Sequence, residues 1–304
     1  MAVDLLIAGR LPPNVVPQLE GHFRLHTLPE SLDDADEMLQ RMGKSIRGLL
    51  TNAAQGAPEA LLEALPNLEI ISSSGVGTDA LNVKIAEARG VRVATTPGVL
   101  TEDVADGAIA LMLAASRRLM QAERNVRAGR WLRDLPLGNR VTGKRLGILG
   151  LGEIGRAVAK RAAAFDMSIA YHQRNQNPDV PYTYHDSLVS LAEASDFLVI
   201  IVPGGPATEN MVNAEVLDAL GPEGILVNVG RGSTVDQPEL IRALQEGRIR
   251  AAGLDVLADE PNVPDALLEL ENVVLTPHYA SGTIETRLAM GQRVVDNILE
   301  YFDR

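Results

Sequence analysis

The chain has 304 residues, a net charge of −12 at pH 7 and no cysteine. Its length predicts about two domains, and its 46% apolar and 22% charged residues are ordinary for a folded globular protein. The acidic balance argues against nucleic-acid and membrane partners, and the lack of cysteine excludes disulfides, thiolate metal sites and thiol nucleophiles.

The first 97 residues alternate between short β-type runs and helical patterns, which predicts a parallel sheet covered on both faces. The opening run contains Asp4 and no basic region, so we expect a strand rather than a signal peptide, and a cytoplasmic protein. The expected strands are Val3–Ala8, Phe23–Thr27, Ile46–Thr51, Leu68–Ser72 and Val91–Thr95, and the expected helices are Leu32–Met42, Pro58–Leu65 and Leu81–Arg89.

The second of these strands carries alternating polar side chains, His22, Arg24 and His26, which we expect on a solvated face. No third metal ligand accompanies the two histidines, so no metal site is expected.

A glycine-containing turn follows the fourth strand at Ser74, Gly75, Val76 and Gly77. One interpretation is a loop that tolerates positive φ. The other is a set of consecutive backbone N–H groups that bind an anion at the carboxyl end of a strand. The residues alone favour neither interpretation, so all four remain candidate substrate-binding residues.

Thr96-Pro97-Gly98 breaks the pattern and predicts the first crossing between domains. Residues Leu100–Arg130 then indicate one long helix. Its first half is apolar on several faces, which predicts burial or a dimer interface. Its arginine-rich second half predicts a solvated or subunit-facing surface, and Trp131 is expected to anchor packing or an interface.

The central motif is Gly150-Leu151-Gly152-Glu153-Ile154-Gly155. It lies between a predicted strand, Leu146–Leu149, and an alanine-rich helix, and a second strand, Ser168–Tyr171, follows. Strand, glycine turn, helix and strand are the setting of a dinucleotide-binding fingerprint. The first two glycines would allow the tight turn and the close approach of a pyrophosphate, and Gly155 would bring the helix close to the strand.

The end of the second fingerprint strand predicts which dinucleotide binds. An NAD-type site expects a carboxylate about 20 residues after the first glycine, but the chain reads Tyr171-His172-Gln173-Arg174-Asn175 there. Arg174 could meet a 2′-phosphate, with Asn175 as a second donor. We therefore predict NADP as the cofactor, with NAD possible; an exposed turn arginine is the alternative interpretation.

Four more predicted strands follow, and the last leads into an amphipathic helix. These strands are Phe197–Val202, Gly224–Val229, Ala251–Val256 and Val273–Thr276, and the helix is Ile284–Phe302.

Three polar residues stand just beyond three of these strands: Arg231, Glu260 and His278. Ligands of open α/β sheets bind beyond the carboxyl ends of the strands, so these side chains can converge. An arginine can hold a carboxylate bidentately, and a histidine beside a carboxylate can transfer a proton near neutral pH. Singly, each could be an ordinary loop or structural residue; together they suggest an acid, its orienting partner and an anion clamp.

Four ordered motifs, at 150–155, 228–232, 253–261 and 276–283, resemble the D-isomer-specific 2-hydroxyacid dehydrogenase family. The tail motif that begins at His278 is most similar to the glyoxylate, hydroxypyruvate and hydroxyphenylpyruvate reductase branch. The resemblance implies two doubly wound, Rossmann-like parallel-sheet domains with a cleft between them: a substrate domain, 1–97 plus 283–304, and a dinucleotide domain, 98–282. It also implies a homodimer that reduces a small-molecule keto acid to a D-2-hydroxy acid with NAD(P)H.

The resemblance implies roles for particular residues. Arg231 would bind the keto acid, Glu260 would pair with the acid/base His278, and the 74–77 turn would bind the substrate carboxylate. Asp255 would face the nicotinamide. The remaining implied cofactor-binding residues are Glu153, Ile154, Val202, Thr208, Val229 and Gly282.

One departure is Ala280, where many members carry glycine, which affects how closely the backbone there approaches the nicotinamide. A nucleotide-sensing protein or corepressor-like scaffold on the same fold is the alternative function, because fold alone does not define activity.

Overall fold

The computed structural model describes residues 2–303, and these form two compact units. Unit 1 comprises Met1–Leu100 and Gly282–Arg304, and unit 2 comprises Thr101–Ser281. The boundaries between the units fall after residues 100 and 281, whereas the sequence predicted them after residues 97 and 282. The assignment of unit 1 to the substrate and unit 2 to the dinucleotide stays a prediction.

Unit 1 is built on a five-stranded parallel sheet with strand order β2-β1-β3-β4-β5. Apolar side chains on its two faces form two separate cores, one beneath α2, α3 and α4 and one beneath α1 and α12. The strands are β1 (Val3–Ile7), β2 (Phe23–Thr27), β3 (Ile46–Asn52), β4 (Ile70–Ser74) and β5 (Arg92–Ala94); the helices are α1 (Val15–Leu19), α2 (Leu32–Met42), α3 (Glu59–Ala64), α4 (Val83–Ala88) and the C-terminal α12 (Ile284–Tyr301).

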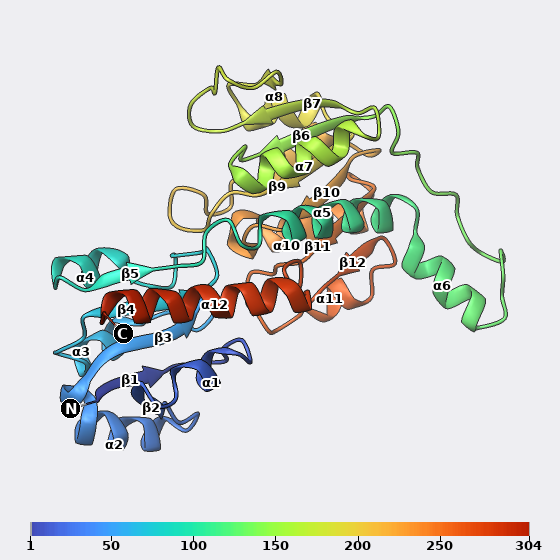
Figure 1. Ribbon diagram of the computed structural model, residues 1–304. Helices are drawn as coiled ribbons and strands as arrows, with labels where there is room; N and C mark the ends of the chain where they lie inside the picture. Colours follow the sequence, from blue (N-terminus) through green and yellow to red (C-terminus); the bar gives the residue numbers. More distant parts are fainter. Residues whose placement is uncertain (1, 304) are drawn as a thin grey trace. The chain divides into compact units, whose positions relative to one another are not determined.

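Unit 2 is built on a seven-stranded parallel sheet with strand order β12-β11-β10-β9-β6-β7-β8 (Figure 1). The order reverses between β6 and β9, and in such sheets ligands bind at that point, beyond the carboxyl ends of the strands. The strands are β6 (Arg145–Leu149), β7 (Ser168–His172), β8 (Thr183–Tyr184), β9 (Phe197–Ile200), β10 (Ile225–Asn228), β11 (Ala251–Leu254) and β12 (Val273–Leu275).

The helices of unit 2 cover both faces of its sheet, so the predicted fold class, two doubly wound parallel sheets, is confirmed. They are α5 (Thr101–Ser116), α6 (Leu119–Arg127), α7 (Glu153–Ala163), α8 (Leu188–Glu193), α9 (Ala214–Leu220), α10 (Gln237–Gln245) and α11 (Asp265–Leu268). Among residues 2–303 no helix is long and apolar enough to cross a membrane.

The single long helix predicted over 100–130 is wrong. Helix α5 ends at Ser116, and Arg118 adopts a left-handed conformation with φ of 51° before α6 begins. The physical reason is a returning segment: the N–H of Asn139 donates to the carbonyl of Ser116 at 2.7 Å, and the Ser116 hydroxyl donates to the carbonyl of Asn139 at 2.9 Å. The end of α5 is therefore capped by chain more than twenty residues further on.

The burial predicted for the apolar first half of this segment is confirmed in α5. The helix packs against α7, β10 and β11, and its apolar side chains are largely buried within unit 2. Helix α6 is the reverse, because it buries polar Gln121 and Asn125 and exposes apolar residues. Exposed apolar side chains on α6 and the segment after it are Leu119, Met120, Val126, Trp131, Leu132 and Leu137. This stretch extends away from the sheet of its own unit (Figure 1).

Strand β2 has the expected solvated face at His22 and Arg24, which are exposed, while His26 is only partly exposed. Arg24 and His26 both contact the buried carboxylate of Asp4 on β1, with Arg24 Nε and His26 Nε2 each 2.8 Å from Asp4 Oδ1. The hydrogen bond from Arg24 lowers the pKa of Asp4, against the opposing effect of burial. The polar residues of β2 therefore satisfy a buried charge.

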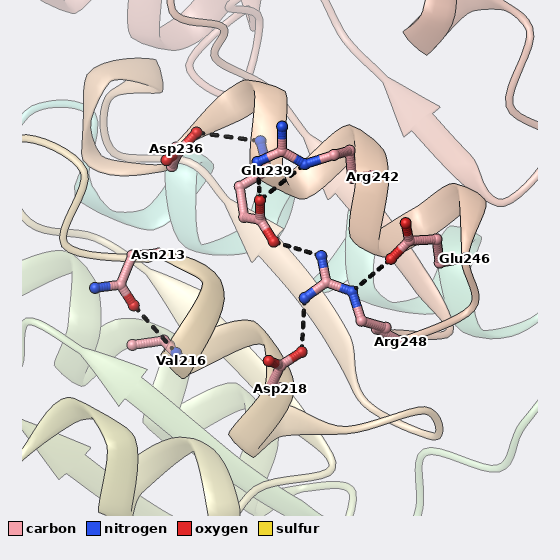
Figure 2. Close-up of polar contacts among 8 residues, drawn as sticks. All are labelled: Asn213, Val216, Asp218, Asp236, Glu239, Arg242, Glu246 and Arg248. Carbon is pink, nitrogen blue, oxygen red and sulfur yellow. Dashed lines mark hydrogen bonds and ion pairs between the residues drawn. The ribbon is translucent and has the colours of Figure 1, made fainter.

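An ion network ties α9 and α10 together on unit 2 (Figure 2). Glu239 is nearly buried and binds both Arg242 and Arg248. Arg248 also binds Asp218 at 2.7 Å and Glu246 at 2.9 Å. The bond to Glu239 is the largest cause that raises the pKa of Arg248. Both oxygens of the Glu239 carboxylate are thus occupied by guanidinium groups.

Candidate active site

The glycine fingerprint adopts the geometry that a dinucleotide requires. Gly150 turns with a φ of +97°, which L side chains rarely adopt. A Cβ on Gly155 would overlap the carbonyl oxygen of Gly150, so the glycine lets α7 pack close to β6. A Cβ on Gly152 would meet nothing within 4 Å, and α7 begins beyond it with no side-chain cap. Open space before an uncapped helix start suits a phosphate group.

Three of the other predicted cofactor residues, Val202, Thr208 and Val229, lie in unit 2, and Gly282 lies in unit 1. Val202 and Val229 follow β9 and β10, and Val202 Cγ1 lies 3.0 Å from where Gly150 would carry a Cβ, against the glycine turn. Thr208 lies in the loop after β9, and its hydroxyl donates to the carbonyl of Pro203 at 2.7 Å. Gly282 falls in unit 1, so unit 2 alone does not bring it together with the others.

Glu153 and Ile154 form the first turn of α7, directly after the glycine turn. The hydroxyl of Thr101 lies 3.5 Å from the Glu153 carboxylate.

The segment after β7 contains a residue that sequence reasoning passed over. Gln173 accepts the backbone N–H of Leu151 at 3.2 Å and donates to the carbonyl of Asn175 at 2.9 Å. It therefore joins the glycine turn to the segment that carries Arg174 and Asn175. The side chain of Arg174 is exposed. The sequence signal that could have identified Gln173 is its amide side chain directly before Arg174 and Asn175, the residues predicted to bind a 2′-phosphate.

Arg231 lies at the carboxyl end of β10, between two glycines. The amide of Asn228 donates to the Arg231 carbonyl at 2.9 Å, and the hydroxyl of Thr234 donates to the same oxygen at 2.6 Å. A Cβ on Gly232 would overlap the backbone of Leu257. The glycine therefore lets the Arg231 turn lie directly against the loop that leads to Glu260.

Glu260 and His278 form the predicted pair. His278 Nδ1 lies 2.8 Å from Glu260 Oε2, and the N–H of Leu257 donates to Glu260 Oε1 at 2.9 Å. Burial acts to raise the pKa of Glu260, but the bonds from His278 and Leu257 and the positive charges of His278 and Arg231 outweigh it and lower this pKa. The carboxylate is therefore ionised and orients the imidazole, whose other nitrogen, Nε2, can hold a proton for a substrate.

Buried Asp255 fixes the turn that carries this histidine. His278 adopts a left-handed φ of 51°. Asp255 Oδ1 accepts the hydroxyl of Thr276 at 2.6 Å and the N–H of Tyr279 at 2.7 Å, and Oδ2 accepts the N–H of Ala280 at 2.9 Å. Sequence reasoning assigned Asp255 to the nicotinamide and did not predict this positioning of the histidine turn.

The unusual Ala280 is accommodated by a glycine on α5. The Cβ of Ala280 lies 3.0 Å from where Gly107 would carry a Cβ, so a side chain at position 107 would crowd Ala280. The extra methyl group of Ala280 therefore fills space that Gly107 leaves open.

In unit 1 the turn predicted to bind an anion follows the end of β4. Gly75 has a φ of +129°, and its N–H donates to the hydroxyl of Thr96 at 3.0 Å. Within residues 2–303 no hydrogen bond is found for the N–H groups of Val76 and Gly77. The Gly75 N–H is thus bonded to Thr96, whereas those of Val76 and Gly77 are open to an anion. Substrate binding by Ser74, Gly75, Val76 and Gly77 stays a prediction.

Comparison with known proteins identifies the family. Residues 109–280 match the model of the D-isomer specific 2-hydroxyacid dehydrogenase, NAD binding domain. Hydroxyphenylpyruvate reductase of Plectranthus scutellarioides is 50% identical, covering 99% of this chain and 96% of the relative. Glyoxylate/hydroxypyruvate reductase A of Arabidopsis thaliana is 48% identical, covering 94% of this chain and 91% of the relative.

The solved structures agree. The NADPH-dependent glyoxylate/hydroxypyruvate reductase of Sinorhizobium meliloti, in complex with NADP and malonate, has a TM-score of 0.91 and 45% identity, covering 99% of this chain and 94% of the other. The fold and site define a nicotinamide-dependent oxidoreductase. The chain belongs to the D-isomer-specific 2-hydroxyacid dehydrogenase family, as its motifs predicted. The relatives named here are reductases, so the corepressor-like alternative is not favoured.

Proposed function

We propose that this protein reduces a small 2-keto acid, such as glyoxylate, hydroxypyruvate or an arylpyruvate, to the D-2-hydroxy acid and prefers NADPH. The observation that carries the proposal is the 2.8 Å contact between His278 and Glu260 on the strand ends that also carry Arg231. The names of the relatives support the substrate class. An acidic, cysteine-free chain supports a cytoplasmic location.

The reaction needs a hydride, which a bound nicotinamide cofactor supplies to the keto carbon, and a proton, which the protein supplies to the keto oxygen. Protonated His278 donates that proton from Nε2, while Glu260 holds Nδ1 and stabilises the imidazolium. Arg231 binds the keto acid and stabilises the negative charge that develops on its oxygen. The N–H groups of Val76 and Gly77 bind the substrate carboxylate.

NADPH preference rests on the residues after β7. The chain has no carboxylate at this strand end to accept a hydrogen bond from a ribose 2′-hydroxyl. Arg174 is exposed, and its neighbour Gln173 is hydrogen-bonded to Leu151 of the glycine turn. A hydrogen bond to a charged group is worth roughly 1.5–3 kcal/mol, or about ten- to a hundredfold in affinity. The NADPH-dependent relative from Sinorhizobium meliloti supports the same preference.

The experiment is kcat/KM for NADPH and NADH in the wild type, Arg174→Asp and Arg174→Lys. We expect the wild type to favour NADPH, Arg174→Asp to lose about ten- to a hundredfold of that ratio, and the charge-conserving lysine variant to keep most of it. A wild type that favours NADH, or an unchanged ratio in Arg174→Asp, contradicts the proposal.

The α6 region supports a homodimer. Its buried polar and exposed apolar residues are the pattern of a helix that completes its packing on another surface. A second copy of the chain is the proposed occupant. Light scattering should give twice the chain mass of 32.6 kDa at micromolar concentration. A measured mass of one chain would contradict the dimer. It would not bear on the proposed activity, which the kinetic measurements test separately.

A further inference from the structure

We propose that Thr96 is a positioning residue for substrate binding, because its hydroxyl fixes the conformation of the turn that presents the Val76 and Gly77 N–H groups. This rests on the proposed function, in which these groups bind the substrate carboxylate. Thr96 belonged in the sequence analysis only to a crossing between domains, and no role in the reaction was predicted for it.

Three hydrogen bonds join Thr96 to Gly75. The N–H of Thr96 donates to the Gly75 carbonyl at 2.9 Å, which extends the pairing of β4 and β5 beyond the ends of both strands. The Thr96 hydroxyl accepts the N–H of Gly75 at 3.0 Å and lies 3.2 Å from the Gly75 carbonyl, to which it can donate. A hydroxyl has one donor and two acceptor positions, so it can satisfy both groups of one residue at once.

The environment makes this arrangement rigid. Thr96 is fully buried, so water cannot replace its hydroxyl. The other side of the turn is limited by Ala53, whose Cβ lies 3.0 Å from where Gly75 would carry one, and whose N–H donates to the Ser74 carbonyl at 3.2 Å. Contacts on both sides thus hold Gly75 at a φ of +129°. A glycine without such contacts would adopt many other conformations as readily.

The segment that carries Thr96 is itself anchored in the core of unit 1. The amide of buried Asn297 on α12 lies 3.3 Å from the Thr95 carbonyl and 3.3 Å from the hydroxyl of Ser72 on β4. One amide therefore connects the two segments that Thr96 joins further along. The orientation of the two available N–H groups is fixed by this framework before a ligand arrives, which reduces the ordering that binding requires.

The test removes the hydroxyl in two matched pairs. Thr96→Val keeps the shape of the wild-type side chain and loses its hydroxyl; Thr96→Ala and Thr96→Ser differ from each other only by the hydroxyl. We expect KM for hydroxypyruvate, and the inhibition constant for the unreactive carboxylate oxamate, to rise about three- to tenfold in each hydroxyl-free member. NADPH affinity should not change, and kcat should change less than KM.

Thr95→Val is the control, because it makes the same change one residue earlier on a side chain outside the bonds to Gly75; it should leave KM unchanged. If Thr96→Val does not fold, the alanine and serine variants still isolate the hydroxyl. Equal KM values within each pair, or an equal rise in Thr95→Val, overturn the inference.

Hydrogen exchange separates this inference from the proposed function. A wild type that reduces no keto acid rejects the proposed function. In that case the Gly75 amide should still exchange faster in Thr96→Ala than in Thr96→Ser. Equal exchange in the two variants shows that the hydroxyl does not hold the turn.

Discussion

Two glutamates of unit 2 each lie beside positive charge, yet their surroundings differ. Glu239 is nearly buried on helix α10, and guanidinium groups of Arg242 and Arg248 occupy both of its oxygens (Figure 2). Glu260 lies in a loop and holds a histidine whose side chain is 41% exposed. The first carboxylate is saturated by groups that cannot release a proton near neutral pH, whereas the second orients one that can.

The comparison shows how a stabilising cluster differs from a reactive one. In the Glu239 network, the arginines bind carboxylates on α9, on α10 and just beyond it. In the Glu260 pair, the partner stands on a turn with a left-handed φ, held by the buried carboxylate of Asp255. Strained backbone that its surroundings must hold in place is typical of functional sites.

The largest effect is expected for the reactive cluster, in His278→Ala. Loss of a positioned proton donor should lower kcat by about 10²–10⁴-fold. NADPH affinity, measured by fluorescence titration, should be unchanged because the glycine turn is intact. His22→Ala, an exposed histidine of unit 1, is the control and should keep full activity. Near-normal turnover in His278→Ala would show that another group donates the proton.

Glu260→Gln should have a smaller effect, a loss of about ten- to a hundredfold in kcat/KM at neutral pH. The lowered pKa of Glu260 means that its carboxylate is ionised throughout the neutral range, where it lies 2.8 Å from His278 Nδ1. A carboxylate favours the cationic form of a neighbouring imidazole, so without that charge the pH at which reduction declines should move down. A pH profile of kcat/KM measures the shift, with Glu269→Gln as the control. An unmoved profile would mean that Glu260 does not act through His278.

The lowered pKa of Glu260 also makes the stability of the fold depend on pH. Because its folded pKa is lowered, Glu260 contributes stability above its ordinary pKa, and this contribution is lost as the pH falls through the lowered value.

The smallest effect on catalysis is expected for the ion network around Glu239. Arg248→Ala removes contacts to Asp218, Glu239 and Glu246 and should lower Tm by about 2–4 °C while leaving kcat unchanged. Arg250→Ala, which removes one exposed pair with Glu223, is the matched control and should change Tm less. A fall in kcat in Arg248→Ala, with Tm unchanged, would reverse the roles of the two clusters.

The sequence predicted those features that depend on local patterns. The fingerprint from Gly150 to Gly155, the parallel strands and the positions of Glu260 and His278 after strand ends all follow from residue types and spacing over short windows. The structure places His278 and Glu260 in contact because both loops leave the same edge of the sheet.

The features that were missed depend on contacts between distant residues. The break after Ser116 is set by Asn139, and the commitment of the Gly75 N–H is set by Thr96. Neither contact has a periodic signal in the sequence. The burial of polar Gln121 and Asn125 on α6, and the exposure of its apolar residues, likewise have no periodic signal in the sequence.

The most direct test of the central claim is the reaction of the wild-type protein with NADPH and hydroxypyruvate, glyoxylate or hydroxyphenylpyruvate. The assay follows absorbance at about 340 nm, and the configuration of the product from hydroxypyruvate or hydroxyphenylpyruvate is determined on a chiral column. The account predicts NADPH oxidation with at least one of the three acids and a hydroxy acid of D configuration. No oxidation with any of them, or a product of L configuration, would contradict it.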